Sequence, residues 1–248
     1  MYRVWDSPTR WFHWINVLTV VLMVLTGFLF MFRKELAIES VEAKYALLIL
    51  HVWIGYVFAA NLLIRIVWGF AGNRFARWRS VLPTRQTIRA LGQDLRDLIA
   101  RRPSAYLGRS PLGRVAMTLM FLLLLIQAGT GLIQAGAQIF YPPFGPLVAR
   151  FVAKPEVDPA TISWRNAKEN VVPHRIGYVS KLRFVSARTH VYTSYFLLLL
   201  IVLHVTGVVL TETRQRSGMV SAMFSGQKTL AVPPVDAEPL ASDDRPAG

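Results

Sequence analysis

The chain has 248 residues, of which 53% are hydrophobic and only 17% are charged. A formal net charge of +14 could indicate a nucleic-acid-binding protein, but the basic residues lie mostly between long apolar runs, as in proteins that cross a membrane. Because cysteine is absent, the sequence excludes disulfides, thiolate metal sites, iron–sulfur clusters and covalently attached haem.

Four apolar runs are each long enough to cross a bilayer, for which about 20 residues suffice. We therefore predict an all-α fold, an integral membrane four-helix bundle. The predicted spans are residues 11–32, 45–70, 112–134 and 188–212. They form one membrane domain, residues 1–225. The tail that follows, residues 226–248, is rich in Pro, Ala and Asp and is predicted to be disordered.

The segment between the second and third predicted spans determines the expected orientation. Residues 73–114 contain ten arginines against two aspartates. Loops rich in arginine and lysine stay on the cytoplasmic side of a membrane. With four spans, both termini are then expected in the cytoplasm. The first apolar run is too long for a cleaved signal peptide, and no typical cleavage site follows it.

Four of the five histidines lie near the ends of spans. On a helix, fourteen residues return to within about 40° of the same direction and climb about 21 Å, so His190 and His204 face one side at two depths. The span directions match His204 with His13 at an inner level and His190 with His51 at an outer level. Each pair could bind one iron from both sides, because neutral imidazole is the usual axial ligand of an electron-carrying haem.

Other interpretations of these histidines stay open. A single histidine at the end of a span is more often an interfacial side chain that hydrogen-bonds to a backbone carbonyl. Zinc or copper fits less well, because two histidines per level leave the coordination of these metals unfilled. The fifth histidine, His174, lies in a polar segment and is expected on the surface.

Glycine and arginine residues suggest further contacts to a cofactor. Gly27 and Gly55 would leave room for a bulky group beside the histidines, although small residues are also common where helices pack. Arg65 and Arg10 could each hold a haem propionate through charge-assisted hydrogen bonds. Both side chains could instead extend to lipid phosphates.

Four segments carry a more specific pattern: V-W-D-S-P-T-R-W-F-H-W-I-N at 4–16, H-V-W-I-G-Y at 51–56, R-P-S-A-Y-L-G-R-S-P-L-G at 102–113 and S-G-M-V-S-A-M-F-S-G-Q-K at 217–228. They resemble the prokaryotic diheme cytochrome b family, which includes the b-type cytochrome subunit of membrane-bound nickel–iron hydrogenases. The resemblance implies two b haems, held by histidines on the first, second and fourth helices. It also implies the bacterial inner membrane as the location.

The resemblance further implies a function. Members of the family pass electrons from a periplasmic partner to membrane quinone, so the chain is expected to be an electron-transfer subunit of an oxidoreductase complex, with quinone as substrate. The partner would be a hydrogenase-like subunit or a cytochrome c, and the complex could be oligomeric. Asn16, Glu212 and Arg214 are the candidate quinone contacts near the inner haem. The connection before the fourth span is longer than in many relatives, which leaves the partner's identity open.

Two alternative functions remain at this point. The chain could be a stand-alone cytochrome b that oxidises quinol and passes electrons to a soluble acceptor. It could also be a haem-free anchor that tethers a soluble complex to the bilayer. The number of haems per chain distinguishes the haem-free anchor from the two electron-transfer functions.

Overall fold

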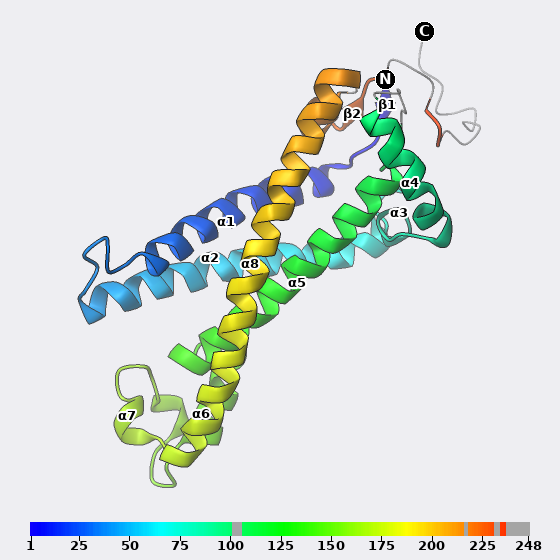
Figure 1. Cartoon of the computed structure of the whole chain (residues 1–248). Helices are drawn as coiled ribbons and strands as arrows, with labels where there is room; N and C mark the ends of the chain where they lie inside the picture. The colour runs from blue at the N-terminus through cyan, green and yellow to red at the C-terminus, as the bar shows by residue number, and fades with distance from the viewer. Residues whose placement is uncertain (101–105, 216–217, 231–233, 237–248) are drawn as a thin grey trace. The chain divides into compact units, whose positions relative to one another are not determined.

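The computed structural model describes residues 1–100, 106–215, 218–230 and 234–236, without the side chains of residues 98, 214 and 215. Within these residues, four helices are long and apolar enough to cross a membrane, which confirms the predicted all-α membrane class (Figure 1). They are α1 (Ser7–Met31), α2 (Val41–Ala71), α5 (Pro111–Ile139) and α8 (Pro173–Gln215). Large apolar side chains on them are exposed, among them Leu63, Val67 and Phe70 at 60% or more. Lipid accepts such a surface, whereas in water it would promote aggregation.

Helix α8 is the longest element, with 43 residues. At 1.5 Å per residue it is about 64 Å long, roughly twice the thickness of a bilayer's hydrocarbon core. It begins fifteen residues before the span that we predict at 188–212. The added stretch carries Arg175, Lys181 and Arg183. These charged side chains are unsuited to lipid but are good helix formers, so the helix extends past the apolar run.

The chain divides into two compact units, and each of the four long helices contributes one stretch to each unit. Unit 1 comprises residues 1–17, 61–122 and 197–248. Unit 2 comprises residues 18–60 and 123–196. His13 and His204 lie in unit 1, and His51 and His190 lie in unit 2. Each unit therefore contains one candidate site.

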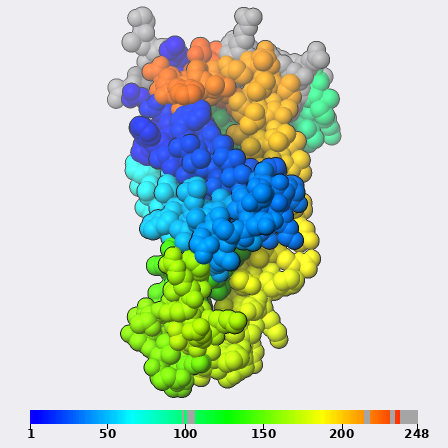
Figure 2. All heavy atoms as spheres, turned by 90° about the vertical axis from the view of Figure 1, so that its left-hand side faces the viewer, coloured from blue at the N-terminus to red at the C-terminus, as the bar shows by residue number. Residues whose placement is uncertain are grey.

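In unit 1, the two ends of the chain pack together. Strand β1 (Tyr2–Arg3) pairs antiparallel with β2 (Gln227–Lys228), which lies in the segment predicted to be disordered. A short helix, α9 (Met219–Ser225), precedes β2 and buries Ala222 against Val4 and Trp5. Figure 2 shows this C-terminal segment, in orange, against the dark-blue N-terminal residues. The apolar contact gives the beginning of the tail a place to fold.

Two further helices, α3 (Trp78–Val81) and α4 (Arg85–Ile99), complete unit 1. Asp6 connects its parts, because the Asp6 carboxylate accepts hydrogen bonds from Trp68 Nε1 at 3.0 Å and from the backbone N–H groups of Asn73 and Thr9, each at 3.1 Å. The Thr9 bond also caps the first turn of α1. Burial by itself raises the pKa of Asp6, but the hydrogen bonds outweigh burial and leave this pKa lowered.

In unit 2, the connection between α5 and α8 is a small folded layer. It contains α6 (Gly145–Val152), the 3-10 turn η1 (Pro159–Thr161) and α7 (Ala167–Asn170), which surround buried apolar side chains that include Ile162 and Val171. The ring of Trp164 stacks on Tyr45 of α2, with ring centroids 3.7 Å apart. This extension therefore has a core of its own.

Candidate functional site

Unit 2 brings His51 of α2 and His190 of α8 together. Their ring centroids are 6.4 Å apart, and the ring planes are inclined by 74°. Two imidazoles that each bind one metal ion at about 2 Å have ring centroids about 6 Å apart. The observed separation therefore fits a single iron between the two rings. We call this pair the outer site.

The Nδ1 atom of each outer-site imidazole is hydrogen-bonded to a threonine on one of the other two long helices, α1 or α5. Thr26 Oγ1 of α1 lies 2.7 Å from His51 Nδ1, and Thr130 Oγ1 of α5 lies 2.9 Å from His190 Nδ1. With both Nδ1 atoms engaged, Nε2 is the nitrogen left to bind a metal on each ring.

The glycine that follows each threonine lies against the same imidazole. A β-carbon on Gly27 would be 3.8 Å from His51 Cε1, and one on Gly131 would be 3.4 Å from His190 Cε1. Larger side chains at these positions would push on the rings. Gly55, predicted to leave room for a cofactor, instead faces Met23, whose Cε lies 3.7 Å from the corresponding β-carbon position.

Unit 1 contains the second histidine pair, His13 of α1 and His204 of α8. Both side chains are half-buried, and their imidazoles are close enough to interact electrostatically. The Nδ1 atom of His13 is buried, and it has no hydrogen-bond partner among the residues that the structure describes. This nitrogen differs in that respect from Nδ1 of His51 and of His190. We call this pair the inner site.

Arg65, also in unit 1, is only 1% exposed. Its guanidinium donates to the Ala76 carbonyl at 2.8 Å and lies 5.2–5.9 Å from the centres of three aromatic rings, those of Phe12, Trp78 and Phe121. The remaining NH1 group is buried, with no hydrogen-bond partner in the described part of the chain. A buried cation of this kind can still donate to an anion.

A second cation, Arg109, is half-buried and lies near Arg65. Its NH1 group donates to the Phe75 carbonyl at 2.8 Å, and its guanidinium lies 4.7 Å from the centre of the Trp5 ring. Burial lowers the pKa of Arg109 to about 9, and the positive charges of Arg65 and Arg114 contribute to this shift. Unit 1 therefore holds two neighbouring cations, Arg65 and Arg109.

Two other predicted contacts of the inner site, Arg10 and Glu212, have partners in the C-terminal segment. Arg10 donates from NH1 to the Phe224 carbonyl, and its Nε atom is buried. Glu212 accepts from the backbone N–H of Met219 at 2.6 Å and so caps α9. Asn16 is half-buried on α1. The side chain of Arg214 lies outside the described residues.

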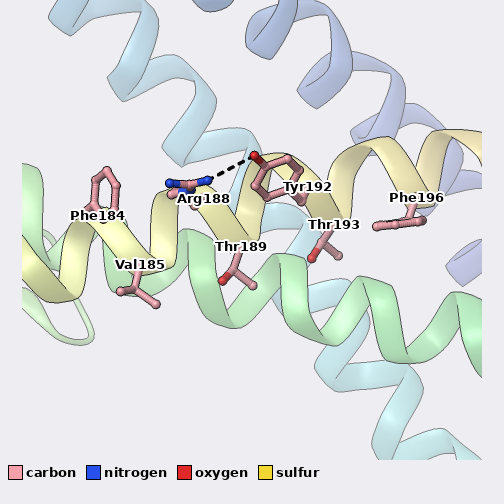
Figure 3. Close-up of a pocket in the computed structure, with 7 residues that line it drawn as sticks. All are labelled: Phe184, Val185, Arg188, Thr189, Tyr192, Thr193 and Phe196. Carbon is pink, nitrogen blue, oxygen red and sulfur yellow. Dashed lines mark hydrogen bonds between the residues drawn. The ribbon is translucent and has the colours of Figure 1, made fainter.

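A groove of about 440 Å³ lies along α8 in unit 2 (Figure 3). Aromatic and aliphatic side chains line it, together with Arg188, whose guanidinium donates to the Tyr192 hydroxyl at 3.3 Å. Figure 3 shows its lining residues arranged along one helix. His190 does not line this groove, which is therefore separate from the outer site.

Comparisons with known proteins identify the family of the chain. A family model described as prokaryotic cytochrome b561 matches residues 4–226. The chain belongs to the prokaryotic cytochrome b561 family. Membership confirms the resemblance seen in the sequence and implies haem b as the cofactor and membrane electron transfer as the activity. No solved structure matches the chain significantly.

Curated relatives of this cytochrome are described as probable Ni/Fe-hydrogenase B-type cytochrome subunits. The Cupriavidus necator protein is 26% identical over 241 residues, which cover 91% of this chain and 86% of the relative. The Escherichia coli (strain K12) protein is 31% identical over 154 residues, which cover 58% of this chain and 65% of the relative. The chain thus matches slightly less than two thirds of the E. coli protein's length.

Sequence reasoning did not identify the two threonines or Gly131 as part of the site. The dipeptide Thr-Gly occurs at 26–27, 130–131 and 206–207. In the first two copies the threonine bonds an imidazole of the outer site and the glycine lies against it. The helix without histidine, α5, therefore contributes to the outer site through these small residues.

Proposed function

We propose that the chain carries electrons across the bacterial inner membrane through two b haems, from a periplasmic redox subunit to the quinone pool. The observation that carries this proposal is the 6.4 Å separation of the His51 and His190 rings, which leaves space for one iron. The names of the hydrogenase-associated relatives support a hydrogenase-like donor. A cytochrome c is the other candidate donor.

At the outer site, His51 and His190 would supply the two axial nitrogens. When bound, haem provides a reversible one-electron change at its iron. The protein contributes the ligands, keeps them on rigid helices and excludes water with the surrounding apolar side chains. Gly27 leaves the approach to His51 open, and Gly55 allows α1 to pack closely through Met23.

At the inner site, His13 and His204 would supply the axial nitrogens. Arg65 would hold a propionate through its NH1 group, and Arg10 would do so through Nε, because both groups are buried without a partner among the described residues. The positive charge of Arg65 and Arg109 favours the state with one more electron, so we expect the inner haem to have the higher potential.

Quinone would bind near the inner site. Glu212 uses Oε2 to cap α9, so its other carboxylate oxygen is the one proposed to exchange a proton with quinone. Asn16 and Arg214 complete the proposed set of contacts. In this arrangement the membrane domain comprises residues 1–225, both termini are cytoplasmic, and the layer between α5 and α8 faces the periplasmic partner.

Hydrogen-dependent reduction in native membranes tests this function. Tagged wild-type chain should co-purify with its partner, and hydrogen should reduce the haems and then a short-chain quinone. The His190→Ala variant should lose this reduction while still inserting into the membrane. A chain that purifies alone and transfers electrons from quinol to a soluble acceptor would overturn the proposed direction and partner.

A further inference from the structure

The hydroxyl groups of Thr26 and Thr130 each make two kinds of contact. Thr26 Oγ1 donates to the Leu22 carbonyl at 2.8 Å, and Thr130 Oγ1 donates to the Ile126 carbonyl at 2.6 Å. Both are bonds to the residue four positions earlier in the same helix, a common arrangement for buried threonine. Since a hydroxyl has only one proton, each hydroxyl must act as an acceptor toward its imidazole.

This assignment determines which imidazole nitrogen carries the proton. Two oxygens separated by 2.8 Å or less repel unless a proton lies between them, so the hydroxyl proton stays on the carbonyl side. His51 Nδ1 and His190 Nδ1 must then be the donors in their short contacts to Thr26 and Thr130. The neutral rings therefore carry the proton on Nδ1 and keep a lone pair on Nε2.

We propose that Thr26 and Thr130 are positioning residues that hold His51 and His190 in the tautomer and ring orientation required for binding iron through Nε2. This inference rests on the proposed haem at the outer site. Each threonine acts with the following glycine, because Gly27 and Gly131 let the threonine-bearing helices approach the edges of the rings.

A direct consequence concerns the potential of the outer haem. A ligand that donates a hydrogen bond from Nδ1 is a stronger base, and it favours the ferric state over the ferrous state. Removing the acceptor should therefore raise the midpoint potential. The inner site serves as an internal reference, because His13 Nδ1 has no hydrogen-bond partner among the described residues.

The test compares Thr26→Val and Thr130→Val, which keep the shape of threonine but lose the hydroxyl, with the corresponding Thr→Ser variants. Thr213→Val is the matched control, because Thr213 Oγ1 also donates to the carbonyl four residues earlier, that of Val209, at 2.8 Å. The measurements are a redox titration of both haems and the low-spin ferric EPR spectrum. A ring inclination of 74° predicts a strongly anisotropic signal for the outer haem.

We expect each Val variant to keep the outer haem but to hold it less tightly, by about tenfold. If that loss falls on the ferric state, it raises the midpoint potential by about 59 mV. The EPR signal should shift as the ring reorients. Ser variants should restore wild-type values, and Thr213→Val should change neither haem. Unchanged potentials and EPR signals in both Val variants would overturn the positioning role.

A second measurement does not depend on haem. In haem-free protein with ¹⁵N-labelled histidine, NMR should show His51 and His190 as Nδ1–H tautomers in the wild type, and mixed tautomers in the Val variants. Wild-type protein with Nε2–H tautomers would refute the inference. If His51→Ala removes no haem while the tautomers are as expected, then the proposed outer haem fails but the hydrogen-bond assignment stands.

Discussion

Gly131 provides a sharp steric test of the outer site. A β-carbon at this position would lie 3.4 Å from His190 Cε1. Optimal carbon–carbon contact is at about 3.5–4.0 Å, so Ala already touches the ring and should be tolerated after a small shift. Val adds two methyl groups at the β-carbon, and in a helix it has essentially one rotamer with which to avoid a clash.

The expected displacement is large compared with what a metal site tolerates. Accommodating Val requires the His190 ring to move by about 1 Å or more, since overpacking is relieved mainly by moving the neighbouring side chain. Metal–ligand distances tolerate only about 0.2 Å. Gly131→Val should therefore lose the outer haem and keep about half of the wild-type haem, whereas Gly131→Ala should keep both.

Haem per purified chain and the reduced-minus-oxidised spectrum provide the assay. The matched control is Gly129→Val on the same helix, because a β-carbon there meets no atom within 4 Å in the described part of the chain. Both substitutions change the same residue type in α5, so their effects on helix stability are comparable. Full haem content in Gly131→Val would refute the placement of His190 as an iron ligand.

Three other perturbations test unit 1 and the extramembrane layer. Asp6→Asn should destabilise unit 1 by about 1–2 kcal/mol in thermal unfolding. Because the pKa of Asp6 is lowered in the folded protein, this difference in stability should be present at neutral pH and should vanish as the pH falls below about 4. A difference in stability that does not depend on pH would contradict this role of the Asp6 carboxylate. Trp164→Ala should remove the stack on Tyr45, which contributes about 0.5–1.5 kcal/mol beyond burial, and should increase hydrogen exchange in residues 145–172. Unchanged hydrogen exchange would show that the stack does not stabilise this layer. Glu212→Gln should increase hydrogen exchange in α9, because Glu212 caps this helix. If quinone binds at Glu212, the same change should raise the KM for quinone at constant haem content. An unchanged KM would remove Glu212 from the quinone site.

The membrane class could be predicted from the sequence because it depends on hydrophobicity alone. Four apolar runs of sufficient length require helices in lipid, whatever their partners. The limits of α8 could not be predicted in the same way. Its first turns lie beyond the apolar run, so hydrophobicity does not mark where the helix begins.

The histidines were accessible to sequence reasoning, but the groups around them were not. His190 is distinctive because an imidazole within a span is costly, whereas threonines and glycines are common in membrane helices. Whether Thr130 contacts His190 or lipid depends on the rotation of α5, which α5's own sequence does not specify. Arg10 illustrates the same limit, since its partner, the Phe224 carbonyl, lies far away along the chain.

Haem quantification in histidine variants tests the central claim most directly. The purified wild-type chain should contain two b haems. His51→Ala and His190→Ala should lose the same spectral component, and His204→Ala should lose the other. A colourless wild-type chain, or loss of one and the same component in His51→Ala and His204→Ala, would contradict the account.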